Sequence, residues 1–162
     1  MNKEDFITII NDHKKIVYKT CYSFCRQEED RKDLEQEILI QLWHSLKQFD
    51  GRVKLSTWIY RVSHNTAISF YRKDKKRRLN KLKLSDYAFY LESEQNETEV
   101  LNEKIARLYK AINQLNDLEK SLILLYLDKL SHSEISNIMG ISESNVGTKI
   151  SRIKLKLKTL LN

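Results

Sequence analysis

The sequence predicts an all-α protein made of two small helical domains joined by an acidic linker. Its 162 residues contain no proline and only three glycines, so helix breakers are rare. Apolar residues recur at spacings of three and four, whereas the strict alternation of strands is hard to find. The charge is basic over residues 71–83, acidic over 85–103 and basic again after Glu143. We therefore expect a division into residues 1–83, 84–100 and 101–162.

Three helices are predicted in the first domain. Apolar residues at helical spacing predict one helix over about residues 3–26, and a second helix follows the acidic sequence EED. The Asp-Gly pair at 50–51 predicts a turn, after which Ser56 or Thr57 is expected to cap a third helix over 58–78. The expected buried stripe of the second helix is Leu34, Ile38, Leu42 and Leu46. That of the third helix is Trp58, Ile59, Val62, Thr66 and Phe70.

The opposite face of this third helix is polar. It is expected to present cations, an amide and an aromatic ring at spacings of three, four and seven, a combination that suits a nucleic acid. The residues of this face are Arg61, His64, Asn65, Tyr71 and Arg72. A formal net charge of +7 also favours an anionic partner.

A helical bundle is predicted for the second domain. Its first helix is indicated by an apolar stripe, and Asn116 or Asp117 is expected to cap the apolar helix that follows. The residues of the stripe are Leu101, Ile105, Leu108, Ile112 and Leu115.

The end of the chain predicts a helix-turn-helix. Ser131 and Glu134 have the spacing of a capping box, and Gly140 can take the left-handed conformation that ends a short helix. Ser142 is expected to cap the last helix, so a short helix, a tight turn and a longer helix follow one another. The expected buried side of the last helix is Val146, Ile150, Ile153, Leu157 and Leu160.

The outward side of this last helix carries small polar residues beside cations, which can donate to base edges and phosphates in the major groove. These candidate DNA-binding residues are Ser144, Asn145, Thr148, Lys149, Ser151, Arg152 and Lys154. Gly147, one turn inside the helix, either permits close backbone approach or is a tolerated defect.

Parts of the sequence also fit other classes of function. Two amphipathic helices joined by a glycine also occur in ordinary bundles, and basic amphipathic helices bind membrane surfaces, but no bulky aromatic anchor follows Tyr126. Carboxylates near His44 could hold a metal in a nuclease, although no further ligand set recurs. Cys21 and Cys25 are expected to be packed thiols rather than a disulfide or a zinc site. The acidic N-terminus predicts neither a signal peptide nor a membrane span.

The sequence resembles a known family, the extracytoplasmic-function sigma factors of bacterial RNA polymerase. The segment DRKDLEQEILIQLWHSL at residues 30–46 is similar to the family pattern D-x-x-D-L-x-Q-E-x-x-x-x-x-W. F-D-G follows at 49–51, S-T-W-I-Y-R-V-S-x-N-T-A at 56–67, and the helix-turn-helix with its basic tail ends the chain. The resemblance covers almost the whole sequence, with one signature in each domain.

The resemblance implies a role for each surface. An acidic helix would bind a coiled coil of the largest subunit of core RNA polymerase, and the matching residues are Asp33, Leu34, Gln36, Glu37, Ile40 and Trp43. The loop from Phe49 to Thr57 and the following helix would open the minus-ten element of promoter DNA and hold a flipped base. The matching residues are Phe49, Arg52, Lys54, Thr57, Arg61, Asn65, Tyr71 and Arg72. The last helix would read the minus-thirty-five element as duplex, although a cation often stands in the family where this sequence has Gly147.

The sequence is therefore interpreted as a cytoplasmic initiation factor without a catalytic residue, a cofactor or a metal. Core RNA polymerase and promoter DNA are the expected partners, and the resemblance adds an anti-sigma factor. The alternative is a stand-alone helix-turn-helix regulator whose N-terminal half senses a signal or dimerises. Such a regulator would not need the segment from Asp33 to Trp43.

Overall fold

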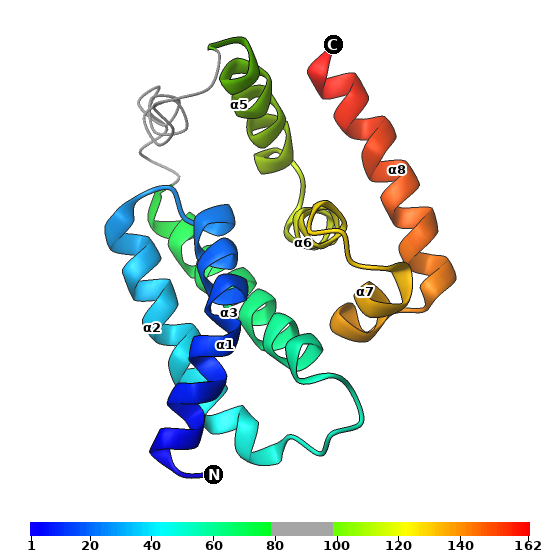
Figure 1. Cartoon of the computed structure of the whole chain (residues 1–162). Coiled ribbons are helices and arrows are strands. Elements are labelled where there is room, and N and C mark those ends of the chain that lie inside the picture. The colour runs from blue at the N-terminus through cyan, green and yellow to red at the C-terminus, as the bar shows by residue number, and fades with distance from the viewer. Residues whose placement is uncertain (79–98) are drawn as a thin grey trace. The chain divides into compact units, whose positions relative to one another are not determined.

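The computed structural model describes residues 1–78 and 99–162 (Figure 1). The chain divides between Asn80 and Lys81 into two compact units. Helices and turns make up the described residues, and no strand occurs among them, so the all-α prediction is confirmed. Most of the predicted linker, residues 84–98, lies outside the described part.

The first unit is a three-helix bundle of α1 (Lys3–Phe24), α2 (Glu28–Ser45) and α3 (Leu55–Arg78). A short 3₁₀ turn, η1 (Leu46–Gln48), extends α2. Each of the three helices packs against the other two. The stripe predicted for the second helix is buried throughout; it consists of Leu34, Ile38 and Leu42 of α2 and Leu46 of η1. Cys21 and Cys25 are buried free thiols, as expected.

Two predicted helix starts in this unit are displaced. The helix α2 begins at Glu28, so the sequence EED forms its first turn. Acidic side chains stabilise this end of a helix because they interact favourably with the positive end of its dipole. Likewise α3 begins at Leu55, so Ser56 and Thr57 lie inside its first turn and do not cap it. The amide of Trp58 already donates to the carbonyl of Lys54.

The buried face of α3 differs from the predicted one. Ile59 is fully buried as expected, but Trp58, Val62, Thr66 and Phe70 are only half-buried. Within residues 55–73, the other buried positions are Thr57, Ser63, His64 and Ala67. Because α3 packs against both α1 and α2, small side chains at the crossings allow close approach and draw their side of the helix inward. The placement of His64 on the polar face was therefore wrong, and Thr57, expected to line the minus-ten site, is buried.

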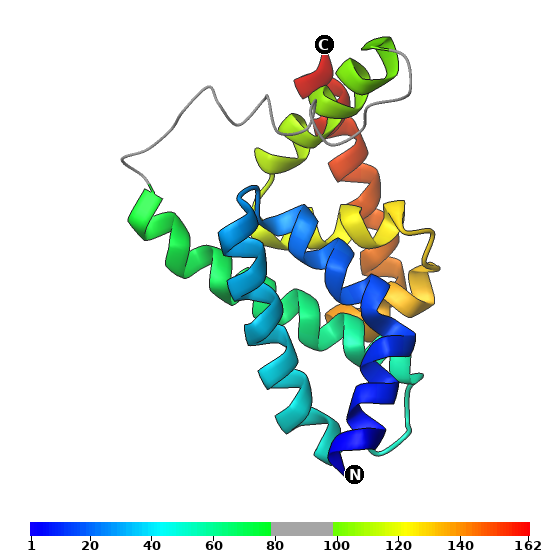
Figure 2. The same ribbon diagram turned by 60° about the vertical axis from the view of Figure 1, so that its left-hand side comes forward.

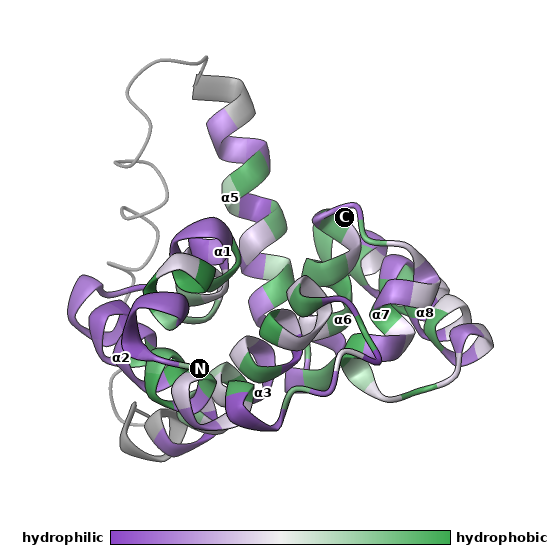
Figure 3. Ribbon diagram, turned by 60° about the horizontal axis from the view of Figure 1, so that its bottom comes forward, coloured by the Kyte–Doolittle hydropathy of each residue, from purple (hydrophilic) through white to green (hydrophobic). Residues whose placement is uncertain are grey.

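The second unit contains α5 (Glu99–Asn113), α6 (Asp117–Leu127), α7 (His132–Met139) and α8 (Glu143–Leu161). Figure 3 shows the alternation of hydrophobic and hydrophilic residues along α5. Asn116 is the cap of α6, in a capping box with Glu119. The core is built around Ile112, Leu122 and Leu125, all fully buried.

Two residues predicted to face this core are exposed instead. Ile105 is 39% exposed and Leu160 is 39% exposed, whereas Val146, Ile150, Ile153 and Leu157 of α8 are buried as predicted. An apolar side chain at helical spacing is buried only where another helix covers it, so periodicity alone overestimates the burial of these two residues. Among the described residues, no helix is both long and apolar enough to cross a membrane.

Candidate functional site

The helix-turn-helix is formed by α7, a tight turn and α8, and the turn is held by local hydrogen bonds. Ser131 and Glu134 form the predicted capping box at the start of α7. Gly140 ends α7 with φ +69°, and the Ser136 hydroxyl donates to the carbonyl of Ile141 at 2.5 Å. Ser142 accepts from the amide of Asn145 and caps α8. Figures 1 and 2 both show α7 beside the first turns of α8, which pack together.

The outer side of α8 is open along its first three turns. Exposed residues on it are Ser144, Asn145, Thr148, Ser151 and Arg152. Lys149 is half-buried. This surface offers hydroxyl, amide and guanidinium donors on a regular helix, the geometry with which a recognition helix contacts base edges and phosphates.

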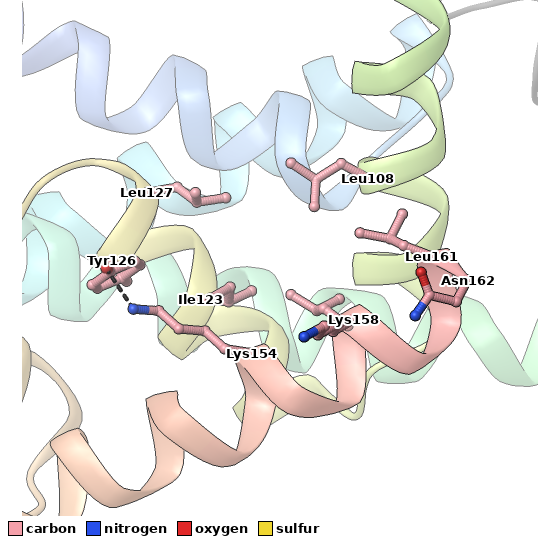
Figure 4. A pocket seen from close by; sticks show the side chains of 9 residues that line it. Leu108, Ile123, Tyr126, Leu127, Lys154, Lys158, Leu161 and Asn162 are labelled. Carbon is pink, nitrogen blue, oxygen red and sulfur yellow. Dashed lines mark hydrogen bonds between the residues drawn. The ribbon is translucent and has the colours of Figure 1, made fainter.

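Lys154 differs from its predicted neighbours because its side chain points towards α6. Its ammonium donates to the hydroxyl of Tyr126 at 2.7 Å and lies 4.1 Å from the centre of that ring (Figure 4). Both residues line a groove of about 430 Å³ in the second unit, together with Leu108, Ile123 and Leu127. Lys154 is thus engaged inside its own unit.

Gly147 faces a residue that the sequence prediction did not single out. A Cβ atom at Gly147 would lie 3.5 Å from both Nδ1 and Cε1 of His132, the first residue of α7. The imidazole thus lies over the backbone of α8 where a larger side chain would project. No sequence pattern could have revealed this pairing, because the two residues are 15 positions apart on different helices.

In the first unit, the acidic face of α2 is accessible. Asp33, Gln36 and Ile40 are exposed, the last by 50%, while Glu37 and Trp43 are half-buried. Leu34, which the resemblance placed with them, is fully buried. Its side chain faces the core because it shares the Ile38 and Leu42 stripe, so a direct contact by Leu34 with a partner is excluded in this structure.

The indole of Trp43 is supported from two sides. The ring of Phe6 in α1 packs edge-on against it with centroids 5.0 Å apart, and the ammonium of Lys47 lies 5.1 Å from its centre. Glu37 accepts a hydrogen bond from Gln41 one turn later. An oriented aromatic ring with carboxylates beside it is typical of a protein-binding surface. Phe6 and Lys47 were missed by the sequence prediction, since their roles depend on the packing of α1 and η1 against α2.

The segment before α3 places an aromatic pair beside cations. The rings of Phe49 and Trp58 pack with centroids 5.6 Å apart, and the guanidinium of Arg61 lies 5.8 Å from the Trp58 centroid. The Arg52 guanidinium forms an ion pair with Asp50 at 3.0 Å, next to Gly51 at φ +77°. This cluster lies at the start of α3.

Along α3, the remaining predicted residues are accessible to different degrees. Lys54, Asn65 and Arg72 are exposed, and Tyr71 is half-buried. Thr57 is buried at 6% exposure, so its hydroxyl does not share this surface. The structure therefore leaves seven of the eight predicted residues accessible to a ligand, spread from the segment before α3 to Arg72.

Metal and thiol chemistry find little support in the described residues. Within residues 1–78 and 99–162, no group of three or more His, Cys, Asp or Glu side chains could hold a metal ion. Burial raises the pKa of the Cys21 thiol to about 12, which keeps it protonated and unreactive at neutral pH.

Comparison with known proteins assigns the family. Sequence profiles of sigma-70 region 2 and of sigma-70 region 4 match residues 9–77 and 105–157. RNA polymerase sigma factor YlaC of Bacillus subtilis (strain 168) is 31% identical over 134 residues, covering 80% of this chain and 76% of YlaC. ECF RNA polymerase sigma factor SigW of the same organism is 28% identical, covering 99% of this chain and 90% of SigW. The chain belongs to the extracytoplasmic-function sigma factors of RNA polymerase.

Solved structures share the fold of this sigma factor. CnrH, in complex with the cytosolic domain of CnrY, matches with a TM-score of 0.69 at 21% identity, covering 99% of this chain and 89% of CnrH. RpoE of Bartonella quintana, in complex with the anti-sigma factor NepR, matches with a TM-score of 0.63 at 18% identity, covering 98% and 95%. Sigma factors are transcription initiation factors, so the alternative of a stand-alone regulator is not retained.

Proposed function

We propose that the two units of this sigma factor divide promoter recognition between them. The first unit docks on core RNA polymerase through α2 and holds the melted strand of the minus-ten element with α3 and the segment before it. The second unit binds the minus-thirty-five element as duplex through α8. The observation that carries this proposal is the pair of accessible polar helix faces, one acidic on α2 and one with donors on α8.

Docking through α2 is supported by the chemistry of its outer face. Asp33, Glu37 and Gln36 supply charge and hydrogen-bonding groups, and Ile40 and Trp43 supply apolar area that a partner can cover. Trp43 is held by Phe6, so little side-chain freedom is lost on binding. Leu34 contributes by anchoring α2 to the core.

Capture of the melted strand requires rings and cations that replace lost base stacking. Phe49, Trp58 and Arg61 provide a compact aromatic and cationic cluster at one end of α3. The remaining donors of this proposed surface are Arg52, Lys54, Asn65, Tyr71 and Arg72. Stacking on such rings contributes about 1–3 kcal/mol per base.

The proposed partners follow from the family. We expect core RNA polymerase and promoter DNA, and an anti-sigma factor by analogy with the CnrY and NepR complexes of the structural neighbours. The proposed site of action is the cytoplasm, where polymerase works. No catalytic residue is assigned to this chain, because its proposed role is positioning and strand capture.

The polymerase-docking proposal is tested by the double variant Trp43→Ala with Glu37→Lys. It is expected to weaken binding to core polymerase at least tenfold, since an apolar anchor is lost and a charge is reversed. The matched control is Tyr18→Ala with Asp12→Lys, which removes an exposed ring and reverses an exposed charge on α1. Equal co-purification of both double variants with core polymerase would refute the assignment of α2.

In vitro transcription with core polymerase and a genomic library tests the proposal as a whole. Transcripts that depend on the added protein should share two upstream sequence elements. Absence of protein-dependent transcripts would contradict the proposal. The shared elements also supply the duplexes with which DNA binding by the holoenzyme is measured.

A further inference from the structure

We infer that His132 of α7 is a DNA-contacting residue that donates to a phosphate beside the recognition helix. This inference rests on the proposed function of α8 and extends its surface to the neighbouring helix. The sequence prediction placed no residue of α7 in contact with DNA.

The imidazole of His132 lies beside Gly147. Two ring atoms, Nδ1 and Cε1, lie 3.5 Å from where a Cβ of residue 147 would stand, an ordinary van der Waals separation. Gly147 thus leaves room for the ring directly over the α8 backbone. A side chain longer than alanine at this position would have to displace the ring.

This location is continuous with the proposed DNA surface. Ser144 and Ser151 stand three residues before and four residues after Gly147, so all three form one row on α8. Both serines are exposed, and so is His132. The imidazole therefore borders the row that faces the major groove in the proposed complex.

The ring is also chemically available. Within the described residues, no hydrogen bond or ion pair involves the His132 side chain, although an imidazole always carries at least one N–H donor. In a helix-turn-helix the first helix crosses the sugar-phosphate backbone while the second enters the groove. An exposed N–H donor at the start of the first helix is placed for a phosphate oxygen and not for a base edge.

The inference has a consequence for position 147. Gly147 itself projects no side chain from α8 at this point. His132 fills the same space from a different helix, so a polar donor is retained without a side chain at Gly147. The glycine is then a space-making residue and not a defect.

The test measures binding of the holoenzyme to a duplex carrying the upstream element found by transcription, and to a shuffled duplex. His132→Ala should weaken binding to both duplexes by about fivefold, because a phosphate contact is independent of sequence. His132→Lys should restore binding to within about twofold, since a lysine also donates to phosphate. His44→Ala, which removes an exposed histidine from the first unit, should leave both affinities unchanged.

A second pair of variants tests the same contact from α8. Gly147→Ala leaves the ring in place and should keep the affinity within about twofold, whereas Gly147→Leu should displace the ring and reproduce the His132→Ala loss. Unchanged affinity in His132→Ala, a loss confined to the selected element, or equal losses in the alanine and lysine variants would each overturn the inference.

The failure of the wider proposal gives a different result. If the wild-type holoenzyme bound the selected element no better than the shuffled duplex, the assignment of α8 would fall, and this inference with it. If the wild type discriminated and His132→Ala bound as tightly, only the role of His132 would be refuted.

Discussion

The burial of His64 predicts that the first unit loses stability in mild acid. Its side chain is 4% exposed in α3, with the Phe24 ring edge-on at 5.7 Å. Burial lowers the pKa of His64 from 6.5 to about 4, because the charged imidazolium would lose its hydration. The folded unit therefore resists protonation at pH values where the unfolded chain accepts a proton.

The sign and size of the effect follow from linkage. The unfolded state binds a proton below pH 6.5 and the folded state only near pH 4, so stability is complete above 6.5 and falls between these values. The free energy of unfolding should drop by about 2 kcal/mol at pH 5 and about 3 kcal/mol at pH 4 from this group. Above pH 7 the contribution should be constant.

The measurement is urea unfolding of the full chain between pH 4.5 and 7.5, followed by tryptophan fluorescence. Both tryptophans, Trp43 and Trp58, lie in the first unit, so the signal reports that unit. His64→Gln cannot titrate and should flatten the pH dependence by about 2 kcal/mol at pH 5, whatever it costs at neutral pH. His44→Gln, at an exposed position, should keep the wild-type slope. Identical pH dependence in wild type and His64→Gln would refute the reasoning.

Further predictions concern the helix-turn-helix. Gly140→Ala should destabilise the second unit by about 1 kcal/mol, because φ +69° is unfavourable for alanine even though no atom lies within 4 Å of the added methyl group; thermal unfolding by circular dichroism checks this. Arg152→Ala should weaken binding to the upstream element by about 1–3 kcal/mol if it reads a base, and an equal loss on shuffled duplex would rule out base reading. Lys154→Ala should weaken DNA binding less than Arg152→Ala but lower thermal stability by about 1 kcal/mol, since its ammonium is bound to Tyr126. An unchanged melting temperature in Lys154→Ala would contradict that stabilising role.

Much of the fold could be predicted because the decisive signals are local. A capping box needs two residues three apart, and a left-handed helix end needs a glycine, so Ser131, Glu134 and Gly140 were assigned correctly. The α2 stripe was equally clear, because its apolar residues repeat every four positions.

The incorrect predictions concern residues whose burial depends on the packing of one helix against another. On α3, the sequence favours large apolar residues as the core, yet Ser63 and Ala67 are fully buried because small side chains fit where two helices cross. His64 is buried beside them, although its place among polar residues in the sequence predicts that it is exposed. Ile105 and Leu160 show the opposite error, since an apolar side chain at helical spacing is buried only where another helix covers it.

The sequence predicted which helix face carries the candidate site, but not which side chains take part in it. Composition and spacing located the outer face of α8, because hydroxyls, amides and cations are visible in the sequence. Whether a given side chain points outward depends on partners far along the chain. Lys154 is drawn to Tyr126, 28 residues earlier, and His132 reaches Gly147 from another helix.

Two lysines of α8 contact α6, which should limit how strongly ionic strength affects the proposed binding of DNA. Five cations follow Glu143, but Lys154 contacts Tyr126 and Lys156 pairs with Glu119 at 2.9 Å, which leaves Lys149, Arg152 and Lys158. Each phosphate neutralised releases condensed counterions, so three cations that contact phosphates correspond to a slope of log K against log salt of about −2.7, instead of about −4.5 for five. Part of the positive charge of α8 thus stabilises the fold, and the proposed complex with DNA should tolerate salt better than the composition of this helix suggests.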